Sequence, residues 1–205
     1  LPNSKDPAPR TKYDFISKQI LHLRLFKGNQ PTRRTTTSAK GLARAKMTAI
    51  FPSMARIRLV QHASGAPGLR WLGLGPDLKP SRSLLKLKHL LDKHAFWARG
   101  RSHRELREML AGSTVVISLW RGKRMIGFGR ATSDGICRAV LWDVVVAGDL
   151  QGCGLGSQVV AALLASSAIR NVERVYLMST NSAEFYLQLG FRSVKNQNLL
   201  IKQQI

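Results

Sequence analysis

The sequence predicts an α+β domain in which a mixed, mostly antiparallel sheet is flanked by helices. Three observations favour this class. Helical and strand periodicities follow one another along the chain instead of forming one long series of either kind. Residues 114–146 contain three β-branched or apolar runs separated by short turns. A glycine-rich turn then joins the last of these runs to a segment of helical period at residues 155–168.

The first 65 residues have a different composition from the rest of the chain. Residues 1–60 contain 13 Lys and Arg against Asp6 and Asp14, and they show no sustained apolar period. We therefore expect residues 1–65 to be a disordered basic arm. Such a composition is typical of an organelle transit peptide, a basic binding arm or an over-long translation. Met47 and Met54 precede the domain, which favours an over-long start or a removable leader.

The predicted domain, residues 66–205, opens with a short strand at residues 71–74 and two helices. Leucines recur near the helical period over residues 81–96, which predicts a helix with one buried face. Ser102 and Glu105 have the spacing of a capping box, so a second helix should begin there and end at Gly112.

Three strands are predicted next, at residues 114–120, 125–132 and 139–146. Gly127 and Gly129 indicate a bulge in the second of them. The third is almost wholly apolar, which is typical of a central strand covered on both faces. The remaining predicted elements are a helix at 155–168, a strand at 172–178, a helix at 182–189, and closing strands at 191–194 and 199–201.

Composition excludes several classes of protein. The 205 residues are 44% hydrophobic with a net charge of +22, and no stretch approaches the ~18 apolar residues of a membrane span. Cys137 and Cys153 form neither a disulfide framework nor a metal-ligand cluster, so we expect no metal. We expect the cytoplasm, or the plastid stroma if the arm is a transit peptide, and no membrane partner. The basic charge favours weak contact with nucleic acid or ribosomes.

The turn from Gln151 to Gly156 is the most informative segment. Glycines at alternate positions let the backbone turn tightly and approach a ligand closely. Amides at a helix N-terminus favour a phosphate group. The turn is not a dinucleotide-binding motif, because Ser157 stands where a third glycine would be required, and no Gly-Lys-Ser/Thr sequence follows.

At these residues the sequence resembles the GNAT superfamily of N-acetyltransferases. The acetyl-CoA signature of that family is matched from Val146 through Gln151 to Gly156. A second family block is matched by Asn181, Phe185, Tyr186, Gly190 and Phe191. Residues 130–135 and 139–146 resemble the cyanobacterial and plastid branch, whose plant members include enzymes assigned protein-lysine, protein N-terminal and serotonin acetylation.

The resemblance implies acetyl-CoA as a substrate and a role for each matched residue. The backbone of Val144, Val145 and Val146 would bind the pantetheine arm and the acetyl carbonyl as an added strand does. Asn181 would contact the same arm, and Tyr186 would protonate the departing thiolate. The phosphates would lie against the turn formed by Gln151, Gly152, Cys153, Gly154, Leu155, Gly156 and Ser157.

The general base is not matched by the family pattern. Many relatives have Glu at positions that are Val140 and Trp142 here. Asp143 is adjacent and is our candidate, although strand alternation should point it to the opposite face. The alternative is that Asp143 pairs with an arginine and that a chain of water molecules accepts the proton of the amine.

Three functions remain open from the sequence. The first is acetylation of a protein lysine or N-terminus. The second is acetylation of a small amine such as an arylalkylamine, and a polyamine is disfavoured because the domain has few acidic residues. The third is a non-catalytic basic module that binds RNA or ribosomes, for which no RNA-reading motif is present.

Overall fold

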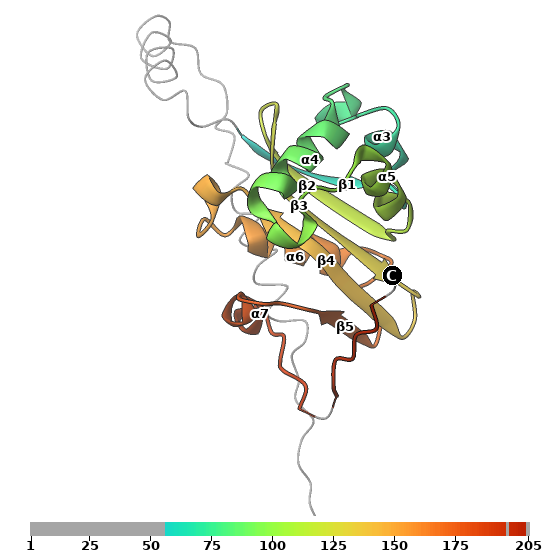
Figure 1. Ribbon diagram of the computed structural model, residues 1–205, viewed down its shortest axis with the longest axis vertical. Helices are drawn as coiled ribbons and strands as arrows, with labels where there is room; N and C mark the ends of the chain where they lie inside the picture. Colours follow the sequence, from blue (N-terminus) through green and yellow to red (C-terminus); the bar gives the residue numbers. More distant parts are fainter. Residues whose placement is uncertain (1–55, 196, 204–205) are drawn as a thin grey trace, which may run out of the picture. The chain divides into compact units, whose positions relative to one another are not determined.

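The computed structural model describes residues 56–195 and 197–203 (Figure 1). Most of the arm expected at residues 1–65, namely residues 1–55, lies outside the described residues. The described part contains one five-stranded sheet with helices on both faces, which confirms the predicted α+β class.

The sheet has its strands in the order β1-β2-β3-β4-β5. Neighbouring strands are antiparallel from β1 to β4, whereas β4 and β5 are parallel, so the sheet is mixed and mostly antiparallel. The strands are β1 (Ile57–His62), β2 (Val115–Arg121), β3 (Arg124–Ser133), β4 (Arg138–Val146) and β5 (Arg174–Leu177).

The first strand differs from the prediction. The segment expected as a strand at residues 71–74 follows a short helix, α3 (Pro67–Arg70), and Trp71 and Leu72 are exposed. The first strand is instead β1, within the residues that we expected to belong to the arm, and it pairs with β2 along its whole length. Most of its side chains are exposed because it is an edge strand, so the sequence shows no strong apolar alternation there.

The C-terminal end also differs from the prediction. Residues 191–194 and 199–201 were expected as closing strands, but no strand follows β5 in the described part of the chain. Leu199, Leu200 and Ile201 are exposed, so this apolar run does not enter the core. Phe191 instead packs against Tyr186.

The helices are close to their predicted positions. The predicted capping box is confirmed, because the Ser102 hydroxyl accepts a hydrogen bond from the Glu105 amide and Glu105 accepts one from the Ser102 amide. The helices besides α3 are α4 (Ser83–His94), α5 (His103–Ala111), α6 (Leu155–Ala165) and α7 (Ala183–Gln188), with single 3₁₀ turns η1 (Pro76–Leu78), η2 (Phe96–Ala98) and η3 (Gly148–Leu150).

The sheet separates α4 from α6. A Cβ added to Gly129 would lie 2.5 Å from Val159 Cγ1, so α6 packs directly on the backbone of β3. On the other face Trp120 is fully buried beneath α4, and Lys86 lies over its ring. The Trp120 indole donates to the Ser118 hydroxyl at 2.8 Å, and His62 of β1 is 2.8 Å from the same oxygen. This buried contact joins β1 to the core.

Candidate active site

A β-bulge lies in the centre of β4. Phe128 pairs with Val145 and Arg130 pairs with Trp142, so the single residue Gly129 on β3 faces both Asp143 and Val144. Asp143 has φ of +50°, a conformation that side chains adopt only at a cost. The bulge expected in β3 is confirmed beside Gly127, because Leu119 pairs with Gly127 and Trp120 with Met125, which leaves Ile126 as an extra residue of β3. Opposite Gly129 the extra residue belongs to β4 instead. A bulge re-aims the side chains that follow it.

The edge of β4 that faces β5 is open after the bulge. The parallel pairing of β4 and β5 ends at Leu141 and Leu177, so Val144, Val145 and Val146 have no β5 partner among the described residues. The carbonyl of Val146 accepts a hydrogen bond from the Gln151 side chain at 3.2 Å. Gln151 thereby holds the following turn against the end of the strand.

The glycine turn presents a run of unpaired amides. The amide of Gln151 bonds to Gly148 and that of Gln158 bonds to Gly154, but the six amides of residues 152–157 have no acceptor in the described part of the chain. Gly152 and Gly154 have φ of +77° and +74°, which explains why glycine is needed at both positions. Gly154 is the N-cap of α6 and has no side chain to bond these amides itself.

The other residues of the turn anchor it. Leu155, the first residue of α6, is buried in the core, whereas Cys153 is exposed. Gly156 serves packing: a Cβ there would lie 3.1 Å from the Phe185 ring. That contact brings α7 onto the N-terminus of α6, next to the free amides.

Contacts from α4 and β3 hold the 3₁₀ turn η3, which precedes the glycine turn. The Gly148 amide donates to His94 Nδ1 at 3.2 Å, and burial lowers the pKa of His94, which favours the neutral ring that accepts this bond. Arg124 binds both oxygens of Asp149 at 2.8 and 2.7 Å and lowers the pKa of that carboxyl to about 2. The turn is therefore held from α4 and β3 before any ligand binds.

Tyr186 lies in an aromatic cluster on α7. Its ring meets Phe185 at 4.8 Å and Phe191 at 5.8 Å between centroids, both in edge-to-face geometry. Burial raises the pKa of the Tyr186 hydroxyl, so it stays protonated at neutral pH. Asn181 is exposed just before the helix and accepts a hydrogen bond from Ser182 at 3.3 Å.

Asp143 is buried and fully paired. Its side chain is 5% exposed, and Arg130 Nε lies 2.7 Å from Oδ2. Arg101 approaches the same oxygen at 3.5 Å, and the Trp97 indole donates to Oδ1 at 3.1 Å. The alternation argument placed Asp143 on the face opposite to Trp142. However, Arg130 is cross-strand to Trp142, lies over its ring and also binds Asp143, because the bulge resets the alternation.

Trp97 and Arg101 were not among the residues that the sequence indicated. Both lie between α4 and α5, some forty positions before Asp143, and no local motif marks them. Together with the exposed Phe96, they form a wall beside the bulge that is aromatic and cationic.

No group of three or more His, Cys, Asp or Glu side chains that could hold a metal ion is present in residues 56–195 and 197–203. Across the same residues, every helix is too short or too polar to cross a bilayer.

A family model described as "Acetyltransferase (GNAT) family" matches residues 84–191, which include the bulge, the glycine turn and the Tyr186 cluster. The chain belongs to this family. The GNAT-family protein of Streptococcus pneumoniae has the same fold, with a TM-score of 0.55 at 18% identity over 73% of this chain and 98% of that one.

Curated relatives of this GNAT chain include an uncharacterized N-acetyltransferase of Pyropia yezoensis, 33% identical over 53% of this chain and 64% of the relative. A GCN5-related N-acetyltransferase of Arabidopsis thaliana, named as chloroplastic, is 39% identical over 35% of this chain and 36% of its own length. The chain thus matches less than two thirds of the length of these relatives.

Proposed function

We propose that the protein transfers the acetyl group of acetyl-CoA to a primary amine, most suitably a lysine side chain or the N-terminus of a protein. One observation carries the proposal: the open edge of β4 leads into six free amides at residues 152–157, and Phe185 of α7, the neighbour of Tyr186 in the chain, packs against Gly156. An extended amide-bearing arm with a diphosphate at one end fits this arrangement, because the strand edge pairs with amides and the helix N-terminus binds phosphate.

We assign the steps of acetyl transfer to different residues of the chain. Acetyl-CoA supplies an acetyl thioester, whose C–S bond breaks as the amine nitrogen bonds to the carbonyl carbon. Backbone amides of Val144–Val146 would stabilise the negative charge on the carbonyl oxygen. Tyr186 would give its proton to the sulfur, and its raised pKa suits this role, because the hydroxyl is protonated when it is needed.

The proton of the amine would go to water. Asp143 was our candidate base, but its carboxylate already accepts hydrogen bonds from Arg130 and Trp97 and lies close to Arg101. Both carboxylate oxygens are therefore already engaged by donors of the protein and are not free to contact the amine. We therefore propose that Asp143 positions the wall between α4 and α5 and that a water chain removes the proton.

The site favours a protein over a polyamine as the acceptor of the acetyl group. The one carboxylate at the bulge is neutralised by two arginines, so a polycation gains no attraction there. An arylalkylamine is the second candidate, because Phe96 and Trp97 are exposed beside the bulge and offer an aromatic contact. A Glycine max relative, 39% identical over 35% of this chain, is named a histone acetyltransferase, and the chloroplastic relatives favour the plastid stroma as the compartment.

The test compares two substitutions at Gly154 by calorimetry with acetyl-CoA. Gly154→Ala strains the backbone, at roughly 1 kcal/mol, but its Cβ meets no neighbouring atom within 4 Å, so binding should be weakened only moderately. Gly154→Glu adds a negative charge at the amides and should abolish binding. Equal affinity of the folded Glu variant and the wild type would refute the cofactor site. Turnover against a panel of peptides and aromatic amines then separates the two acceptor classes.

A further inference from the structure

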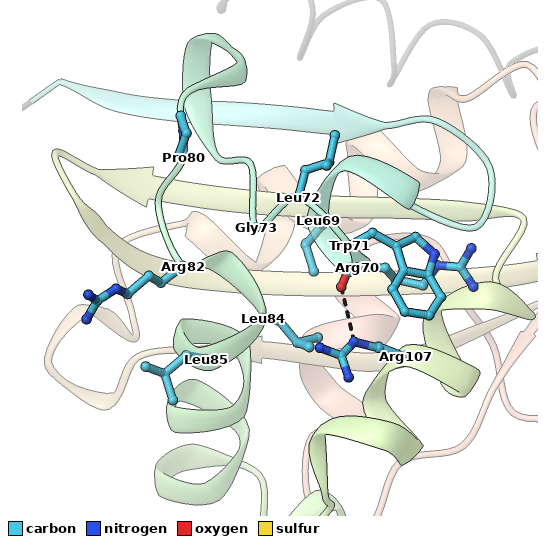
Figure 2. A pocket seen from close by; sticks show the side chains of 10 residues that line it. All are labelled: Leu69, Arg70, Trp71, Leu72, Gly73, Pro80, Arg82, Leu84, Leu85 and Arg107. Carbon is cyan, nitrogen blue, oxygen red and sulfur yellow. Dashed lines mark hydrogen bonds between the residues drawn. The ribbon is translucent and has the colours of Figure 1, made fainter.

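A hollow of about 390 Å³ lies away from the glycine turn (Figure 2). It is lined by α3 and the residues after it, by residues 80–82, by the first turn of α4 and by α5. The acetyl-transfer site uses the bulge, the turn and α7, so none of its residues line this hollow. We call it the Trp71 pocket after its most exposed aromatic residue.

Two guanidinium groups lie near the ring of the exposed Trp71. Its side chain is 65% exposed, and the guanidinium carbons of Arg70 and Arg107 lie 5.5 and 5.3 Å from its ring centroid. Arg107 Nε donates to the Arg70 carbonyl at 3.3 Å, which fixes α5 to the end of α3 (Figure 2). Arg82 stands at the opposite rim. These contacts preorganise positive charge around an indole.

The positive charge of the pocket is not compensated by the described residues. No Asp or Glu lines it. The acidic residues of adjoining elements are engaged elsewhere, Asp77 with Arg58, Glu108 with Arg104, and Glu105 in the capping box. Arg70 Nε is buried without a hydrogen-bond partner among those residues. No described acceptor therefore offsets the charge of Arg70 at this atom.

The pocket also has an apolar component. Leu69 and Leu84 are buried at its base, while Leu72 and Leu85 are 67% and 50% exposed. Tryptophan and arginine are among the residue types that dominate binding energy in protein interfaces, and the exposed leucines beside them add apolar surface. The ligand must therefore carry both negative charge and aliphatic surface.

Charge restricts the identity of the ligand. The chain carries a net charge of +22, and residues 1–55 hold 11 Lys and Arg against Asp6 and Asp14, so neither a second copy nor this segment complements the pocket. Single-stranded nucleic acid binds through aromatic side chains on which successive bases stack, whereas Trp71 is the one aromatic residue that lines the pocket, and two guanidinium groups already lie near its ring.

We propose that the Trp71 pocket is a docking site for a segment of a partner protein in which acidic residues alternate with aliphatic ones. The carboxylates pair with Arg70, Arg82 and Arg107, and the aliphatic side chains pack on Leu72 and Leu85. This interaction is independent of acetyl transfer.

The experiment measures binding of a labelled peptide that alternates Glu and Leu to the full-length protein by fluorescence anisotropy. Arg107→Gln and Trp71→Ala should each raise the dissociation constant by about tenfold or more. Arg170→Gln is the matched control, because it removes the same charge, whereas Arg170 is exposed and does not line the pocket. It should leave the affinity within about twofold, and all variants should remain folded at the assay temperature and keep the acetyl-CoA affinity of the wild type.

Two further ligands test the proposal, a peptide without acidic residues and an oligothymidylate. A peptide with Gln in place of Glu should bind at least about tenfold more weakly. Equal loss in the Arg170 and Arg107 variants would mean that net charge alone attracts the peptide, which overturns the pocket. Binding of an oligothymidylate that depends on Trp71 and Arg107 while the acidic peptide does not bind would assign the pocket to nucleic acid and would also overturn the proposal.

Discussion

At the scale of single residues, the hydroxyl of Tyr186 is the group that the proposed chemistry uses most directly. Tyr186→Phe keeps the ring that packs between Phe185 and Phe191 and removes only the proton donor. We expect turnover to fall by roughly 100-fold or more, with nearly unchanged acetyl-CoA affinity. Steady-state kinetics and calorimetry on the same preparation measure both quantities. A variant that turns over at the wild-type rate would remove Tyr186 from the mechanism.

His62 predicts a pH dependence of stability. Burial lowers its pKa from 6.5 to about 4, because the ring lies against Ser118 in the core. The unfolded chain binds the proton at a higher pH than the folded chain does, so stability is full above about pH 6.5 and falls as the pH drops toward 4. The loss should reach about 3 kcal/mol at most.

Urea unfolding across this range tests the role of His62. The comparison is with His62→Gln, which keeps a group able to bond Ser118 but does not titrate. The difference in the free energy of unfolding between the two proteins should change with pH, since carboxylates titrate equally in both. Parallel pH profiles would show that His62 is not the responsible group.

The direction of the Asp143 side chain and its contacts with Trp97 and Arg101 could not be predicted from the sequence. Pairing of Asp143 with an arginine was left open from the sequence, and Arg130 is that partner in the structure. The direction predicted for Asp143 was wrong, because strict alternation holds only for a regular strand and the extra residue of the bulge reverses it. The contributions of Trp97 and Arg101 depend on how α4 and α5 pack, which no local pattern encodes.

At the scale of elements, Gly129 sets the distance between α6 and the sheet. A Cβ at this position would lie 2.5 Å from Val159 Cγ1 and 3.2 Å from Leu163 Cδ1. Gly129→Ala should therefore displace α6, lower the free energy of unfolding by about 1–3 kcal/mol and weaken acetyl-CoA binding through the shifted turn.

Val159→Ala removes the atom that the new methyl group would meet. The double variant Gly129→Ala/Val159→Ala should consequently be more stable than the sum of the single effects allows, by about 1 kcal/mol. A double-mutant cycle in urea measures this coupling. Strict additivity would show that β3 and α6 are not in the close contact described.

Elements with strong local signals were predicted best. The capping box located α5, and the glycine turn located the start of α6, because both depend on residues close in sequence. The edge strand β1 was missed because Arg58 and Gln61 interrupt its apolar residues and its stability comes from pairing with β2, more than fifty residues away. The closing strands were wrongly predicted from apolar runs such as Leu199–Ile201, which the structure leaves exposed.

At the scale of the whole molecule, the boundary of the domain decides which truncations are tolerated. The sequence placed the boundary at residue 66, whereas β1 supplies the edge of the sheet from Ile57. A chain that begins at Ala66 loses this strand and leaves the Ser118 hydroxyl without His62. We expect it to lose at least about 3 kcal/mol of stability, which lowers the melting temperature by roughly 6–12 °C.

A chain that begins at Met54 keeps β1 and should behave differently. It removes 11 Lys and Arg together with Asp6 and Asp14, which lowers the net charge from +22 to +13. We expect it to keep the melting temperature and the acetyl-CoA affinity of the full chain but to lose much of any salt-sensitive binding to RNA, since fewer cations are available to neutralise phosphates. Calorimetry and RNA titrations at two salt concentrations measure these properties. If this chain instead melts as early as the one that begins at Ala66, the residues before Met54 contribute to the stability of the domain, and the domain extends further toward the N-terminus than β1.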